Sequence, residues 1–140
     1  MRSSPRRALR AAVRRLPEPV LERTLGGPRA LGLLFDALAR RFDPAAAGGF
    51  TGDLAFALTT RDGARRDWTV TVGPDGRARA RRGPSAAPSL TVRSGVADLL
   101  RMAAGEVDPG SALLDGRLDL EGDFAVATRA AAMFGLRSPF

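Results

Sequence analysis

Three consecutive segments of the chain alternate between two kinds of side chain, and short turns join them. The segments are residues 52–60, 67–72 and 77–81, and the turns are RDGARR and GPDG. A period of two is typical of a half-buried β-strand, and Asp-Gly pairs favour tight turns. The large apolar side chains of the first two segments fall on one face: Leu54, Phe56, Leu58, Trp68, Val70 and Val72. The pattern predicts an antiparallel meander of three strands.

Helical periodicity flanks the meander on both sides. Before it, a helix is predicted from Arg29, with one apolar face made of Leu31, Leu34, Phe35, Leu38 and Phe42, and the sequence DPAAAGG is expected to end it. After it come a strand at 89–93 with Leu90 and Val92 inward, a helix at 95–105 and a short helical turn within 108–116. For the helix at 95–105 we expect Ser94 as the N-cap and Gly105 as the stop signal.

The chain closes with a short strand between Gly116 and Gly122 and an alanine-rich helix at 124–136. Leu118 and Leu120 share one face of this strand, and Gly122 allows a sharp turn into the helix. The order of elements predicts an α+β fold, a single five-stranded and mostly antiparallel sheet covered by helices. A length of 140 residues favours one domain with a real core.

Positive charge is concentrated at the N-terminus. Residues 1–26 hold seven arginines and two glutamates, whereas the rest of the chain holds 15 arginines and 13 acids. We therefore predict a basic N-terminal arm over residues 1–27, joined by GGPR to a domain over 28–140. Leu9, Val13 and Leu16 would share one face of a helix in the arm. Such a segment suits an anionic membrane, a protein partner or nucleic acid, and it also suits a solubilising tail or a helix docked on its own domain.

Missing residue types exclude several kinds of chemistry. The chain has no cysteine, histidine or tyrosine, so thiolate and imidazole catalysis and the usual zinc sites are excluded. We expect no enzyme activity, no catalytic residue, no cofactor and no metal site. No apolar run approaches the ~20 residues that span a bilayer, and the first residues lack the apolar core of a secretory signal. A cytoplasmic protein is the expectation.

Residues 89–136 carry a series of features in a fixed order: a strand, a helix that ends in glycine, an Asp-Pro turn, a short helix, a strand between glycines and a final helix. The positions are Leu99-Leu100, Gly105, Asp108-Pro109, Gly116 and Gly122-Asp123. Together with the hairpin at 54–76, this series resembles the sterol carrier protein type 2 domain family over roughly residues 29–137. The resemblance implies non-covalent binding or transfer of an apolar lipid (fatty acyl, sterol-like or isoprenoid) in a cavity between sheet and helices.

The apolar faces predict which residues such a cavity would use. Small alanines between large residues leave room, and methionine adapts to varied apolar ligands. The candidate ligand-binding residues are Leu34, Leu38, Phe56, Leu58, Trp68, Val70, Leu99, Met102, Leu113, Leu118, Leu120, Phe124, Ala127, Ala131, Met133 and Phe134. The alternative is that these residues are plain core, which is the commoner meaning of an apolar stripe. The resemblance favours the cavity.

Two rows of charged residues are weaker indicators of a binding site. Arg77, Arg79 and Arg81 form a one-sided stripe that could hold phosphate, although a solvated strand edge is commoner. Asp119, Glu121 and Asp123 lack the spacing of a calcium loop, so a solvent face is expected. Two other functions stay open: an accessory or scaffold module that docks through the arm, and nucleic-acid binding. The second is less favoured, because Trp68 is the one aromatic residue among residues 61–82.

Overall fold

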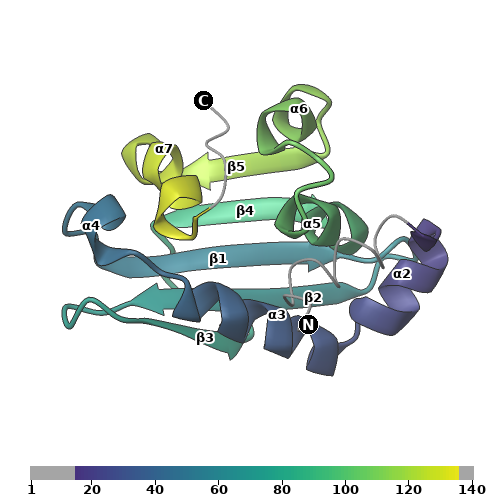
Figure 1. The fold of residues 1–140 in the computed structure, drawn as a ribbon, viewed down its shortest axis with the longest axis horizontal. Helices are drawn as coiled ribbons and strands as arrows, with labels where there is room; N and C mark the ends of the chain where they lie inside the picture. The colour runs from purple at the N-terminus through teal and green to yellow at the C-terminus, as the bar shows by residue number, and fades with distance from the viewer. Residues whose placement is uncertain (1–14, 136–140) are drawn as a thin grey trace, which may run out of the picture.

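A computed structural model describes residues 15–135, and its five strands form one sheet in the order β3-β2-β1-β4-β5 (Figure 1). The strands are β1 Gly52–Thr59, β2 Arg65–Val72, β3 Ala78–Arg82, β4 Leu90–Gly95 and β5 Leu118–Gly122. The β1–β2, β2–β3 and β4–β5 pairs are antiparallel, and the central β1–β4 pair is parallel. The predicted five-stranded, mostly antiparallel sheet is confirmed.

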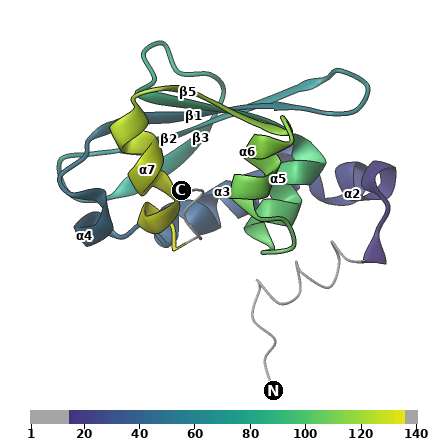
Figure 2. The same cartoon turned by 90° about the horizontal axis from the view of Figure 1, so that it is seen from above.

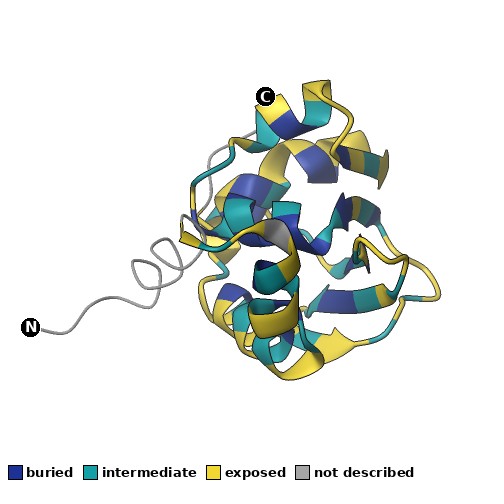
Figure 3. Cartoon of the chain, turned by 90° about the vertical axis from the view of Figure 1, so that its right-hand side faces the viewer, coloured by how far each residue is buried: buried dark blue, intermediate teal, exposed yellow. Residues whose placement is uncertain are grey.

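The helices cover one face of this sheet, as the view from above shows (Figure 2). They are α2 Glu18–Leu25, α3 Pro28–Arg40, α4 Pro44–Ala47, α5 Val96–Ala103, α6 Pro109–Leu114 and α7 Phe124–Met133. Buried residues are concentrated where the helices meet the sheet (Figure 3). The α+β class is therefore confirmed, with a core on one side of the sheet.

Aromatic packing anchors α3 to the sheet. The ring of Phe35 stacks on Trp68 with centroids 5.2 Å apart, and it meets the edge of Phe56 at 5.0 Å. Phe35 is completely buried. Offset stacking and edge contacts are the geometries that aromatic pairs prefer. The predicted apolar face of α3 thus packs on the helical side of β1 and β2.

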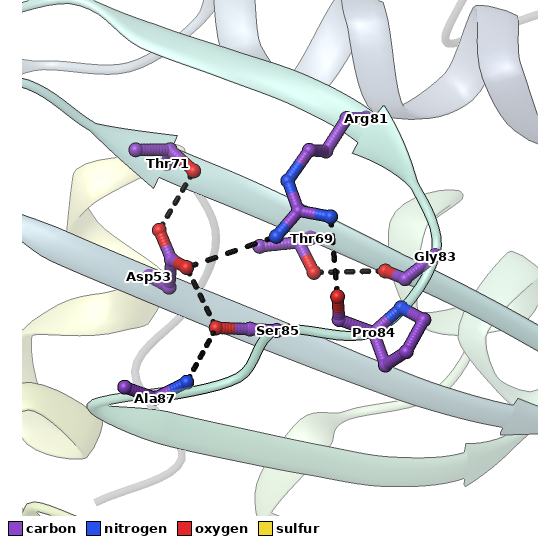
Figure 4. A network of polar contacts seen from close by, with 8 residues as sticks. All are labelled: Asp53, Thr69, Thr71, Arg81, Gly83, Pro84, Ser85 and Ala87. Carbon is purple, nitrogen blue, oxygen red and sulfur yellow. Dashed lines mark hydrogen bonds and ion pairs between the residues drawn. The ribbon is translucent and has the colours of Figure 1, made fainter.

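The loop at residues 83–89, which we call the crossing loop, runs over the opposite face of the sheet (Figure 4). The chain must pass β2 and β1 to travel from β3 to β4. On its way the hydroxyl of Thr69 donates to the carbonyl of Gly83 at 2.9 Å, and the hydroxyl of Ser85 donates to Asp53 Oδ2 at 2.6 Å. These contacts explain why Thr69 is fully buried although it faces away from the helices.

Two local predictions are corrected. Ser94 is not the N-cap of α5, because it lies in β4 opposite Leu58 and its hydroxyl donates to the carbonyl of Gly95; Gly95 is the N-cap residue. The sequence DPAAAGG ends α3 but also contains the short helix α4, which the periodicity did not reveal. Asp43 caps α4 by accepting from the amide of Ala45 at 3.0 Å, an Asp-Pro start signal visible in the sequence.

Part of the predicted arm packs on the core. Residues 18–25 form α2, and its Leu21 is completely buried in the main apolar cluster. Leu16 is partly buried against the same cluster. Leu9 and Val13, with the rest of residues 1–14, lie outside the described residues. The boundary at residue 27 stays a prediction.

Candidate functional site

An apolar cavity of about 120 Å³ lies between the sheet and the helices. Its floor is made by β1, β4 and β5 through Leu54, Phe56, Leu90, Val92, Leu118 and Leu120. One wall is made by Leu99, Met102, Ala103 and Pro109, and the other by Ala127, Ala130, Ala131 and Phe134, with Leu38 contributed by α3. Every side chain that lines the cavity is apolar.

Strand register builds the floor. Leu54 lies opposite Leu90 in the parallel β1–β4 pair, and Phe56 lies opposite Val92. Val92 in turn lies opposite Leu120 in the antiparallel β4–β5 pair. Residues opposite each other in paired strands project from the same face. The floor therefore depends on β4, which joins two strands that are far apart in the sequence.

The alanine wall belongs to α7. Ala127, Ala130 and Ala131 recur at helical spacing, so their methyl groups share the side that faces the cavity. The helix begins at Asp123, whose side chain accepts from the amide of Ala125 at 2.9 Å. Asp123 itself follows Gly122, which has a φ of 124°. The cap and the glycine fix where α7 leaves the sheet.

The opposite wall belongs to α5 and the start of α6. Leu99, Met102 and Ala103 also recur at helical spacing. Gly105, with a φ of 80°, ends this helix as the sequence predicted. Pro109 then stands at the first position of α6 and closes the wall.

A gap in the packing explains the cavity. The buried residues form a main cluster, which draws on the helices α2, α3, α4, α5 and α7 and the strands β1, β2 and β4, and a smaller cluster of Met102, Ala112 and Leu118. Partly buried Val92 and Leu120 contact both clusters. Lining residues come from both clusters, and alanines occupy the α7 side. Close packing fills a core when large side chains meet; here small residues leave the space between the two clusters open.

The structure divides the sixteen candidate residues into two groups. Nine line the cavity: Leu38, Phe56, Leu99, Met102, Leu118, Leu120, Ala127, Ala131 and Phe134. The other seven do not: Leu58, Trp68, Val70 and Met133 lie in the main core, Leu34 packs against it, Leu113 packs against the smaller cluster, and Phe124 is 68% exposed. A ligand-binding role for the nine stays a prediction.

Sequence reasoning missed six lining residues: Leu54, Leu90, Val92, Ala103, Pro109 and Ala130. Periodicity had already placed Leu54, Leu90 and Val92 on the inward faces of their strands. The missing information was the parallel pairing of β1 with β4, which brings these faces together. A rule that extended the wall by one helical turn from Ala127 would have found Ala130.

Charged groups lie outside the cavity. On the face opposite the helices, Arg79 pairs with Asp75 at 3.1 Å and Arg81 Nη2 lies 3.9 Å from Asp53 Oδ2. Hydrogen bonds from Ser85 and then Thr71 hold the pKa of Asp53 below its ordinary value, although partial burial opposes this effect. The arginine stripe thus has acidic neighbours, which favours a solvated face over a phosphate site.

Two members of the acidic row, Glu121 and Asp123, are also engaged locally. Glu121 pairs with Arg93 on the neighbouring strand, and Asp123 caps α7. These contacts favour structural roles over cation binding.

A second hollow, of about 610 Å³, lies beside α2 and the turn between β1 and β2. Its lining includes Glu22, Arg23, Arg61, Asp62 and Arg66, and the carboxylate of Glu22 accepts from the amide of Arg61. Charges of both signs beside open solvent favour water over an apolar ligand. The apolar cavity is the stronger candidate site.

Comparison with known proteins identifies one matching family. The family model described as the SCP-2 sterol transfer family matches residues 35–135. No match to a curated protein was found. Across residues 15–135, no helix is long and apolar enough to cross a membrane.

Several solved structures are similar to this chain. The crystal structure of sterol carrier protein 2 like 2 from Aedes aegypti is 25% identical, with a TM-score of 0.58, and the match covers 71% of this chain and 91% of that chain. A solution structure of the palmitated form of that protein is 24% identical, with a TM-score of 0.60 and coverage of 76% and 92%. A stereoselective inverting sec-alkylsulfatase from Pseudomonas sp. is 28% identical, with a TM-score of 0.57, but the match covers 80% of this chain and 18% of the sulfatase.

Proposed function

Because this chain belongs to the SCP-2 sterol transfer family, we propose that it binds an apolar lipid without covalent chemistry and carries or presents it. The ligand classes that suit it are fatty acyl, sterol-like and isoprenoid chains. The observation that carries the proposal is the cavity between sheet and helices, whose lining is entirely apolar. Burial of hydrocarbon there is favourable by about 25 cal/mol per Å² of apolar surface removed from water.

Energetics support a ligand in this cavity. Enclosed and unfilled apolar space costs a folded protein about 24 cal/mol per Å³, so 120 Å³ costs at most about 3 kcal/mol in a cavity that opens partly to solvent. Domains of ordinary size are stable by only about 5–15 kcal/mol. A ligand that fills the space therefore stabilises the fold appreciably.

The proposed role is non-catalytic. No ionisable or hydroxyl side chain lines the cavity among residues 15–135, so the described lining offers no side-chain acid, base or nucleophile. The sulfatase match covers less than a fifth of that enzyme. Its reaction is therefore not proposed for this chain.

The proposal is tested with a fluorescent fatty acid that brightens in apolar surroundings. We expect stoichiometric binding to the delipidated protein and displacement by unlabelled palmitate. The Ala131→Leu variant should lose binding at least about tenfold, because a larger side chain occupies the wall that Ala131 leaves open. Native mass spectrometry of the freshly purified protein should identify any lipid that it already carries.

Ala132→Leu is the matched control. Ala132 is the next residue of α7 and is exposed, whereas Ala131 is buried. If the two variants bind the probe equally well, the cavity is not the binding site. If fatty acyl, sterol and isoprenoid ligands all fail to bind the wild-type protein, the proposed function is wrong.

The arm adds a second proposal, a docking element for an anionic membrane or a protein partner. Its support is the charge of residues 1–26. Deletion of residues 1–14 should abolish binding to phosphatidylserine vesicles or to a partner while probe binding survives; this deletion keeps α2, whose Leu21 belongs to the core. Unchanged vesicle and partner binding would exclude the docking role. A cytoplasmic location and the absence of nucleic-acid binding stay predictions from the sequence.

A further inference from the structure

Within residues 15–135, the side chains that line the cavity offer no group that could recognise a polar headgroup. Its fifteen lining residues are leucine, phenylalanine, valine, methionine, alanine and proline. A hydroxyl or carboxylate drawn inside would give up its hydrogen bonds to water without replacement. Leaving a buried polar group unpaired in this way is strongly unfavourable.

The buried polar side chains nearby are already engaged. Among the described residues the buried polar side chains are Ser94 and Thr69. The hydroxyl of Ser94 donates to the carbonyl of Gly95 at 3.0 Å, and that of Thr69 donates to Gly83 on the opposite face of the sheet. In the floor, β1 and β4 each have a paired strand on both sides, and β5, the edge strand, is paired with β4 alone. No side chain of the described floor is therefore available to receive a ligand hydroxyl.

The size of the cavity limits what enters it. Its volume of about 120 Å³ lies well below the ~300 Å³ at the small end of ligand sites. A flexible alkyl chain can insert its end into this space and leave the remainder outside. A sterol nucleus is rigid and wide, so it must enter as a unit and requires much more space between the α5 and α7 walls.

We infer that the cavity binds the terminal part of a single alkyl chain, leaves the headgroup in water and discriminates against sterols. This inference rests on the proposed lipid-binding function and narrows it. The chain length and saturation of the hydrocarbon then decide affinity, and the charge of the headgroup does not. Fatty acids, fatty alcohols and fatty esters with the same chain are equivalent ligands.

The test is a displacement series on the delipidated full chain, with each competitor delivered as a monomer from cyclodextrin. The competitors are palmitic acid, hexadecanol, methyl palmitate and cholesterol. We expect the first three to displace the fluorescent probe with affinities within about threefold of one another, and cholesterol to be at least about tenfold weaker.

A matched pair of variants tests whether the floor binds only the hydrocarbon part of the ligand. Val92→Thr places a hydroxyl in the floor at nearly constant size, and should weaken all three alkyl ligands alike, by about fivefold or more. Thr91→Val changes the neighbouring residue of β4, which does not line the cavity, and should leave binding unchanged.

The outcomes separate this inference from the proposed function. Palmitic acid that binds about tenfold or more tightly than hexadecanol would show recognition of the carboxylate and overturn the inference, as would cholesterol that binds as well as the alkyl ligands. In both cases lipid binding itself stands. If no competitor displaces the probe, or the probe does not bind, the proposed function fails and the inference fails with it.

Discussion

The carbonyl oxygen of Ser89 accepts a hydrogen bond from the amide of Asp123, with 2.8 Å between the two atoms. The amide of Ser89 donates in turn to the carbonyl of Asp53 at 2.9 Å. One residue thus connects the starts of β1, β4 and α7. The floor of the cavity and its alanine wall are held together at this point.

Gly122→Ala should disrupt that junction. A Cβ atom on Gly122 would lie 2.5 Å from the carbonyl oxygen of Ser89, and the φ of 124° is unfavourable for alanine. We expect a loss of about 2 kcal/mol in the free energy of unfolding, measured by urea denaturation, together with weaker probe binding. Gly63→Ala is the control, because it has a φ of 89° and no neighbour near the new Cβ. Equal losses for the two variants would show that the contact with Ser89 is unimportant.

Asp53 should make the free energy of unfolding depend on pH in the acidic range. Hydrogen bonds from Ser85 and Thr71 lower the pKa of Asp53 in the folded state. Its contribution is therefore complete above the ordinary aspartate pKa of about 3.9 and is lost as the pH falls through the lower folded value. Asp53→Asn should lower stability at neutral pH by about 1 kcal/mol and reduce the loss on acidification. The exposed Asp36→Asn should change neither; an identical acid profile for wild type and Asp53→Asn would contradict the assignment.

Ala131→Leu should stabilise the ligand-free protein while it blocks the ligand. The leucine fills space that costs the wild-type fold stability, and cavity filling commonly adds about 1 kcal/mol. Thermal unfolding should show a higher Tm for the delipidated variant than for delipidated wild type, and no further rise when palmitate is added. Ala132→Leu should behave like wild type in both respects. A lower Tm for Ala131→Leu would show that the wall has no room for the larger side chain.

Phe35→Ala should be far more damaging than Phe124→Ala. Phe35 is completely buried between Trp68 and Phe56, and removal of a core phenylalanine costs about 3–5 kcal/mol. Phe124 is 68% exposed, so its loss should cost less than about 1 kcal/mol. Chemical denaturation of the two variants compares them directly. A similar loss in the free energy of unfolding for both variants would mean that Phe124 makes stabilising contacts that its exposure does not reveal.

Alternation and helical spacing predicted which face of each element is apolar, but not which part of that face borders the cavity. Leu58, Trp68 and Val70 share the helical side of the sheet with Phe56, yet they pack in the main core, where Trp68 stacks on Phe35 of α3. The spacing of apolar residues along a strand or helix shows which way a side chain points, but it does not show which residue of another element lies beside it. Phe124 was misplaced for a related reason, because it is the first residue after the Asp123 cap and is exposed there.

The parallel pairing of β1 with β4 could not be predicted from the sequence pattern either. Both strands present apolar residues to the helices, and nothing local in either one encodes which edge of the meander β4 joins. The crossing loop fixes that choice through Asp53 and Thr69, whose partners Ser85 and Gly83 belong to an otherwise unremarkable loop. Such long-range polar contacts have no periodic signature.

The position of β4 also has a consequence for the order of folding. Strands β1, β2 and β3 are neighbours in the sequence and can pair through short turns, whereas Leu54 meets Leu90 only after the crossing loop has spanned two strands. Pairings between distant segments form more slowly, because the intervening chain must first be closed. A nascent chain that has made only its meander lacks β4, β5 and α7, so the proposed lipid site cannot form until these elements have joined the sheet.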